Sequence, residues 1–92
     1  GDNLYRYRVT TVNNKAVIKL PTYFRYLNEN EMIWVSPVDS FGRAYGKLSP
    51  DRLEVRVTSD QDGDYNVLVM GTRYDKNAKE YWKGAERMKN GN

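Results

Sequence analysis

The sequence predicts a small all-β domain, built as an antiparallel sheet or a β-sandwich. In several segments apolar and polar residues alternate with a period of two, the pattern of half-buried strands. Short stretches rich in Asn, Asp, Gly and Pro separate these segments and favour turns. At 92 residues the chain has the size of one compact domain, so we expect a single domain over residues 1–92 with frayed ends at 1–3 and 90–92.

The first alternating segment covers residues 4–11, where Tyr5 and Tyr7 alternate with Arg6 and Arg8. Two adjacent Asn residues follow it and tolerate the left-handed conformation of a tight turn. Alternation then resumes, so we expect the two segments to form a hairpin.

A short helix is predicted near 21–28. Pro21 can open a helical turn, because its missing N–H falls where a helix has no partner. Tyr23, Phe24 and Leu27 then present one apolar edge.

The next strand is expected over residues 31–36, with apolar side chains on both of its faces. Such a strand is typical of a central position that is covered on both sides. Residues 40–48 indicate a loop that runs into a short extended piece, and two more strands are expected over 52–58 and 65–72. We expect the core to contain Ile18, Leu20, Phe24, Leu27, Trp34, Val55, Val57, Val67 and Val69.

Near residues 76–88 the apolar residues take the spacing of an amphipathic helix, which would place Ala78, Tyr81, Trp82 and Ala85 on one face. The alternative fold is therefore α+β, with this last helix packed across one sheet face.

The composition narrows the possible chemistry. The chain has neither Cys nor His, which removes thiol chemistry and the commonest general base and transition-metal ligand. The net charge is +3, and the basic excess lies in residues 73–92. No apolar run is long enough to span a membrane, so membrane insertion is not expected.

Asp60, Asp62 and Asp64 have the spacing that opens a calcium-binding loop. The rest of that loop is missing, because Gly63 occupies the fourth position and Gly71 occupies the twelfth, where a bidentate Glu is needed. We interpret the cluster as a solvated turn and expect neither a metal nor another cofactor.

Enzyme activity is not expected either. Carboxylates suited to glycoside hydrolysis could come from Asp39, Asp51, Glu54 or Glu80, but nothing in the sequence selects a pair. The basic tail with Tyr74, Tyr81 and Trp82 could bind nucleic acid. A solvated helix face explains it better, since acidic residues are interspersed there.

Three stretches resemble a β-rich module that recurs in bacteriophage tail-fibre and virion appendage proteins. They are residues 19–28 (KLPTYFRYLN), then 36–38 (SPV) with 41–45 (FGRAY), then 69–75 (VMGTRYD) with 81–84 (YWKG) and Glu86. The resemblance implies a fragment of a long, homotrimeric fibre of the virion, made in the host cytoplasm. Its role would be assembly or host attachment without catalysis.

The alternative is a carbohydrate-binding adhesin module of a cell-surface protein. For binding a host glycan or receptor, the candidates are Phe41, Tyr45 and Trp82, because aromatic rings stack on sugar faces and these three lie beside Gly residues. For contact between copies of the chain, a small module covers aromatic faces best against itself. The expected contact residues are Tyr5, Tyr7, Tyr23, Tyr81, Trp82 and Met88.

Overall fold

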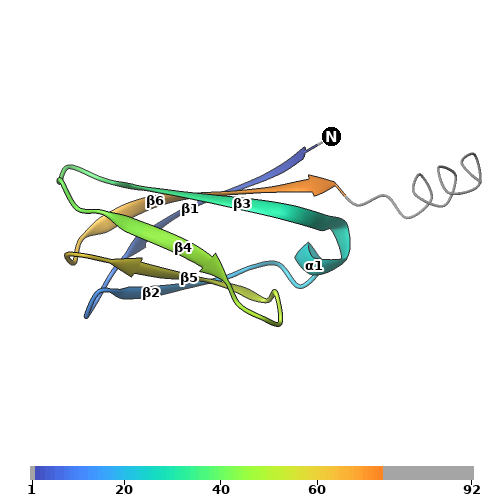
Figure 1. The fold of residues 1–92 in the computed structure, drawn as a ribbon, viewed down its shortest axis with the longest axis horizontal. Helices are drawn as coiled ribbons and strands as arrows, with labels where there is room; N and C mark the ends of the chain where they lie inside the picture. The colour runs from blue at the N-terminus through green and yellow to red at the C-terminus, as the bar shows by residue number, and fades with distance from the viewer. Residues whose placement is uncertain (1, 74–92) are drawn as a thin grey trace, which may run out of the picture.

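The computed structural model describes residues 2–73 as two antiparallel sheets that pack face to face, a β-sandwich (Figure 1). In sheet A the order is β1 (Asp2–Thr10), β6 (Asp64–Arg73) and β3 (Asn28–Pro37). In sheet B the order is β2 (Lys15–Lys19), β5 (Glu54–Ser59) and β4 (Ala44–Leu48). The prediction of a small all-β domain is confirmed. Because β1 begins at Asp2, residues 2 and 3 belong to the strand, although we expected a frayed end there.

The expected first hairpin is wrong. β1 pairs with β6 and β2 pairs with β5, so the two strands lie in different sheets. Between them Val12 and Lys15 form an isolated bridge, with N–H to carbonyl distances of 3.0 and 3.2 Å, around Asn13 and Asn14. Both Asn residues have positive φ, as a tight turn requires. Beyond this turn the strands diverge, because in a sandwich each must cover the core from its own side.

β3 is an edge strand of sheet A, not the central strand that the sequence predicted. Ile33 and Val35 face the core, whereas Met32 is 57% exposed and Trp34 is 45% exposed on the outer face. Alternation along a strand sends every second side chain outward, and the described residues place no further layer over that face. The assignment of Trp34 to the core is therefore wrong.

The core lies between the two sheets. Seven of the expected core residues are buried, and they form one cluster: Ile18, Leu20, Phe24, Val55, Val57, Val67 and Val69. Tyr65 is also fully buried, and its phenol donates to the carbonyl of Gln61 at 2.7 Å. Leu27 is exposed, so the expectation that it belongs to the core is wrong.

The predicted short helix exists as α1 (Phe24–Leu27), which closes one end of the sandwich (Figure 1). It is held there because Phe24 is fully buried and meets the ring of Tyr5 edge-on, with ring centroids 5.2 Å apart. The helix predicted near 76–88 lies outside the described residues, and so does the α+β packing that depended on it.

The two ends of the sandwich differ. At one end lie three turns, residues 12–15, 38–43 and 60–63, which we call the turn end (Figure 1). At the other end lie α1, the start of β1 and the end of β6. Within residues 2–73 no helix has the length and apolar character needed to cross a membrane.

Candidate binding surfaces

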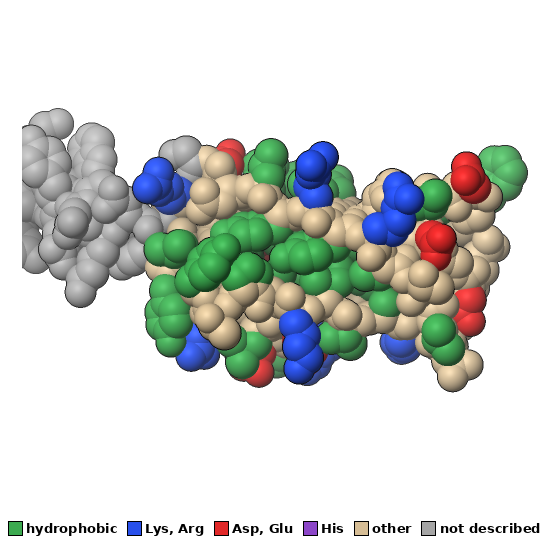
Figure 2. Space-filling model, turned by 180° about the vertical axis from the view of Figure 1, so that it is seen from behind, with side chains coloured by type: hydrophobic (Ala, Val, Ile, Leu, Met, Phe, Trp, Pro, Cys, Tyr) green, Lys and Arg blue, Asp and Glu red, His purple; other side chains and the backbone are tan. Residues whose placement is uncertain are grey.

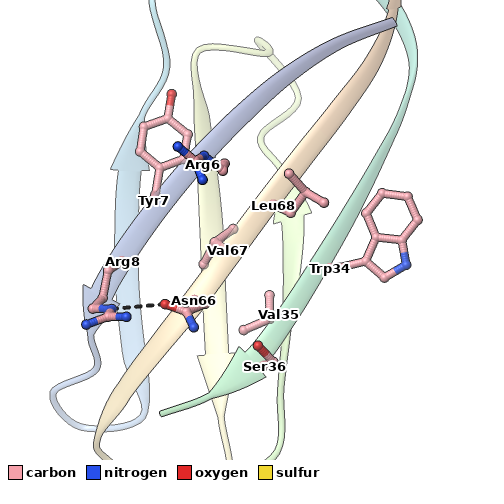
Figure 3. Close-up of a pocket in the computed structure, with 9 residues that line it drawn as sticks. All are labelled: Arg6, Tyr7, Arg8, Trp34, Val35, Ser36, Asn66, Val67 and Leu68. Atoms are coloured by element: carbon pink, nitrogen blue, oxygen red, sulfur yellow. Dashed lines mark hydrogen bonds between the residues drawn. The ribbon is translucent and has the colours of Figure 1, made fainter.

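The outer face of sheet A carries apolar side chains from all three of its strands. Cross-strand register places Leu4 beside Met70 and Met70 beside Met32, and it places Trp34 beside Leu68. We call these five residues the apolar face. Figure 3 looks onto this side of sheet A, with Leu68 on the central strand and Trp34 on the neighbouring edge strand. The edge residues are strongly exposed, Leu4 being 61% accessible.

Polar groups border the apolar face on its β1 side. Arg6 lies across from Leu68, and one row further along Arg8 lies across from Asn66. The Arg8 Nε donates to the Asn66 side-chain oxygen at 2.9 Å (Figure 3). A shallow hollow runs over these residues, so the face combines apolar area with donor groups at its margin.

The predicted contact residues Tyr5, Tyr7 and Tyr23 lie near one another. Tyr5 and Tyr7 are half-buried residues of β1, and Tyr23 is exposed just before α1. Burial raises the pKa of Tyr7, and the neighbouring phenols of Tyr5 and Tyr23 raise it further. Asn28 donates to the Tyr5 hydroxyl at 2.9 Å, which fixes that ring in the fold. Tyr81, Trp82 and Met88 lie outside the described residues.

Hydrophobic side chains are also visible away from the sheet faces. Figure 2 shows them gathered in the middle of one long side of the molecule, with Lys and Arg side chains above and below. The sandwich therefore exposes apolar area along its side as well as on sheet A.

The outer face of sheet B has a different character. One row across its strands is Lys15, Thr58 and Tyr45, and the next is Val17, Arg56 and Lys47. We call the outward residues Lys15, Lys19, Tyr45, Lys47 and Arg56 the basic face. All five side chains are exposed.

Acidic side chains on this sheet are engaged locally. Glu54 accepts a hydrogen bond from Arg56 at 3.2 Å, and Asp60 pairs with Arg43 at 3.4 Å beside the end of the sheet. Lys19 and Lys47 form no ion pair with another residue of the described range. The basic face therefore keeps a positive excess.

The aspartates that resemble a calcium loop are spread over the turn end. Asp62 accepts from the backbone N–H groups of Asn13 and Asn14 at 3.0 and 2.6 Å. Asp64 accepts from the Thr10 hydroxyl at 2.6 Å. Asp60 accepts from the backbone N–H of Arg43 at 2.7 Å, and this bond is the main reason its pKa is lowered. The carboxylates serve to tie the turns together, and no group of acidic residues in 2–73 is placed to hold a metal ion.

The carboxylates considered for glycoside hydrolysis lie in different elements of the described part of the chain. Asp51 accepts from the Ser49 hydroxyl at 2.7 Å and from the Leu53 N–H at 3.0 Å, both of which lower its pKa. Glu54 pairs with Arg56 on sheet B, and Asp39 lies in the loop after β3. Glu80 lies outside the described residues.

Two of the predicted ligand-binding residues, Phe41 and Tyr45, lie on different parts of the sandwich. Phe41 is fully exposed in a loop of the turn end, whereas Tyr45 is 62% exposed on the basic face. Trp82 lies outside the described residues. Sequence reasoning missed the apolar face because Trp34 was assigned to the core. Met32 and Trp34 alternate with Ile33 and Val35, and since both pairs are apolar the segment carries no signal of which pair faces outward.

No protein-family model matches the chain, and no curated protein or solved structure is similar enough to count as a match.

Proposed function

We propose that the chain is a non-catalytic structural module of a phage tail fibre or related virion appendage that associates with copies of itself. In the parent fibre the assembly is a homotrimer, and the module also contributes to contact with the host surface. The observation that carries this proposal is the apolar face of sheet A.

The apolar face is unusual for an isolated domain. Single exposed apolar residues are common, but a contiguous group across three strands is typical of a contact surface. Covering the apolar face removes apolar area from water, which stabilises the assembly by about 25 cal/mol for each Å² buried. The indole of Trp34 is the natural anchor, since Trp residues often dominate the energy of protein contacts.

The resemblance to fibre modules adds to this argument. Its first stretch, residues 19–28, supplies the buried Leu20 and Phe24 together with α1. That stretch therefore maintains the fold, which leaves the contact role to outward side chains. A fibre requires such outward contacts because identical chains pack about a common axis.

Sedimentation velocity over a concentration series tests the proposal. We expect the wild-type chain to associate, and we expect Trp34→Ser to weaken association about tenfold or more, as loss of an anchor residue does. Val17→Ser is the matched control, because Val17 is 55% exposed but lies on sheet B. A wild-type chain that stays monomeric at every concentration, or equal weakening by both variants, would contradict the proposal.

A second candidate function is attachment to a surface glycan or receptor, and the exposure of Phe41 favours it. The loop that presents this ring is ordered by a hydrogen bond from the Gly42 N–H to the Ser40 hydroxyl at 3.3 Å. Ordering before binding lowers the entropic cost of contact. On a glycan array, Phe41→Ala should remove binding, whereas Val12→Ala, at an exposed apolar residue of the same end, should retain it.

A further inference from the structure

The basic face brings together residues from three strands that are far apart in the sequence. Lys15 comes from β2, Arg56 from β5, and Tyr45 and Lys47 from β4. The register aligns Lys15 with Tyr45 through Thr58, and it aligns Lys47 directly with Arg56. A shallow hollow runs over these rows.

From this juxtaposition we infer that the outer face of sheet B binds an acidic polysaccharide. The inference goes beyond the proposed self-association, because it concerns the opposite face of the sandwich and different residues. The ligand class follows from two features, the spacing of the cations and the single exposed ring among them.

The cations are spread in two dimensions over a flat surface. Neighbouring strands lie about 4.8 Å apart, and residues two apart on a strand are separated by about 7 Å. Lys15, Lys47 and Arg56 therefore lie within the length of a few sugar units. The Lys15 ammonium donates to the Thr58 hydroxyl at 3.2 Å, which holds one cation over the face while it remains exposed.

Tyr45 supplies the other feature. Its ring is exposed on the same side of β4 as Lys47, two residues along. An aromatic ring can stack on the apolar side of a pyranose while a neighbouring ammonium meets the carboxylate that the sugar carries. A uronic acid polymer offers both groups in each unit.

Single-stranded nucleic acid fits this face less well. Proteins that bind it stack successive bases on several aromatic rings along a positive groove. On sheet B, Tyr45 is the sole aromatic side chain among the outward residues of the described strands. The rest of the face offers cations and the aliphatic Val17.

The test titrates the chain with oligogalacturonate, with neutral dextran and with an oligo-dT strand, first at low and then at physiological salt. We expect saturable binding of oligogalacturonate, no binding of dextran, and weaker binding of oligo-dT. Lys47→Gln and Tyr45→Ala should each weaken oligogalacturonate binding about three- to tenfold, as the loss of one exposed charge or stacking contact does. Backbone amide shifts of the wild-type chain should change at β2, β4 and β5.

Arg6→Gln is the matched control, since it removes the same charge from the outer face of sheet A. At physiological salt we expect it to change the affinity less than twofold, because under that condition a charge across the sandwich is separated by more than the screening length. The proposal is overturned if Arg6→Gln weakens binding as much as Lys47→Gln, if oligo-dT binds more tightly, or if oligogalacturonate does not bind. Circular dichroism confirms that each variant is folded. Self-association is tested on the apolar face of sheet A, and oligogalacturonate binding is tested on the basic face of sheet B. The two proposals can therefore fail separately.

Discussion

Arg52 joins the two sheets through Glu31. Its guanidinium donates from Nη1 to Glu31 Oε1 at 3.0 Å and from Nη2 to the carbonyl of Asn28 at 2.8 Å. Arg52 lies in the turn between β4 and β5, whereas Glu31 and Asn28 belong to β3. The second carboxylate oxygen of Glu31 is buried and has no hydrogen-bond partner among the described residues. The guanidinium is therefore the main support of this carboxylate.

The first prediction concerns this ion pair. Arg52→Ala should lower the free energy of unfolding by about 1 to 3 kcal/mol, because it leaves the partly buried Glu31 without its cation. Adding Glu31→Gln should restore part of the loss. Urea denaturation of both single variants and the double variant measures the coupling. Additive effects of the two changes would show that the pair contributes nothing.

Arg52 also has φ of 62°, a conformation that costs a residue with a side chain about 1 to 2 kcal/mol. Arg52→Gly loses the same contacts as Arg52→Ala but relieves this cost. We therefore expect Arg52→Gly to be the more stable of the two variants in the same denaturation experiment. The opposite order would refute the assignment of strain to this position.

The second prediction concerns the packing of the two sheets at Gly46. A Cβ added to Gly46 would lie 2.6 Å from Ile33 Cγ2 and 3.3 Å from Val55 Cγ1. Gly46→Ala should therefore destabilise the fold by about 1 to 3 kcal/mol through overpacking. Gly63→Ala is the matched control, because nothing lies within 4 Å of its added Cβ. Thermal denaturation should show a large loss for the first variant and little change for the second.

The third prediction is a loss of stability in acid. The pKa values of Asp51 and Asp60 are lowered below the ordinary 3.8, chiefly by the Ser49 hydroxyl for Asp51 and by the Arg43 N–H for Asp60. As the pH falls toward that value, the unfolded chain takes up protons before the folded chain does. These carboxylates therefore stabilise the fold at pH values above their unfolded pKa. This stabilisation is lost as the pH falls through their folded pKa values.

Asp60→Asn tests this dependence. It should lower the melting temperature at neutral pH, and the difference from wild type should shrink as the pH falls below the ordinary aspartate value. Asp39→Asn is the control, because this aspartate lies outside the hydrogen-bonded turn contacts made by Asp60 and Asp51. A difference that stays constant with pH would contradict the prediction.

The strands could be predicted from the sequence more fully than their pairing. Period-two alternation in β1 and β5 is strong because one face of each strand is turned toward the core and the other is turned outward. Alternation does not identify the neighbouring strand, however, so the turn at Asn13 and Asn14 suggested a hairpin where the chain crosses between sheets. β3 was misplaced for a related reason, since its outer face is apolar and resembles a buried one.

The candidate surfaces were harder to predict than the fold. Lys15, Lys47 and Arg56 become neighbours through the β2, β5, β4 pairing, which no local pattern encodes. Tyr45 was identified as a candidate ligand residue because its ring is aromatic. The cations that surround it are known only from the register in which β2, β5 and β4 pair. Exposure of Trp34 depends on how many layers the fold has, which alternation within one segment cannot tell.

The last prediction concerns the turn between β1 and β2. Asn13 and Asn14 have φ values of 54° and 64°, and Asp62 accepts from both of their N–H groups. In this left-handed conformation Gly has no penalty, whereas Ala clashes with the following carbonyl oxygen. Asn14→Ala should therefore destabilise the fold by about 1 kcal/mol relative to Asn14→Gly, as turns of this type strongly prefer Gly at their second central position.

Both changes at Asn14 remove the same side-chain amide, so their difference isolates the backbone. The N–H that donates to Asp62 is retained in each variant, and the Asp62 contact should survive. Urea denaturation of the pair gives the difference directly. If Asn14→Ala and Asn14→Gly were equally stable, the turn would owe its conformation to the Asp62 carboxylate and not to the residues inside it. Asp62→Ala would then be the more damaging change, because it would leave both N–H groups to water and release the turn from the end of the sandwich.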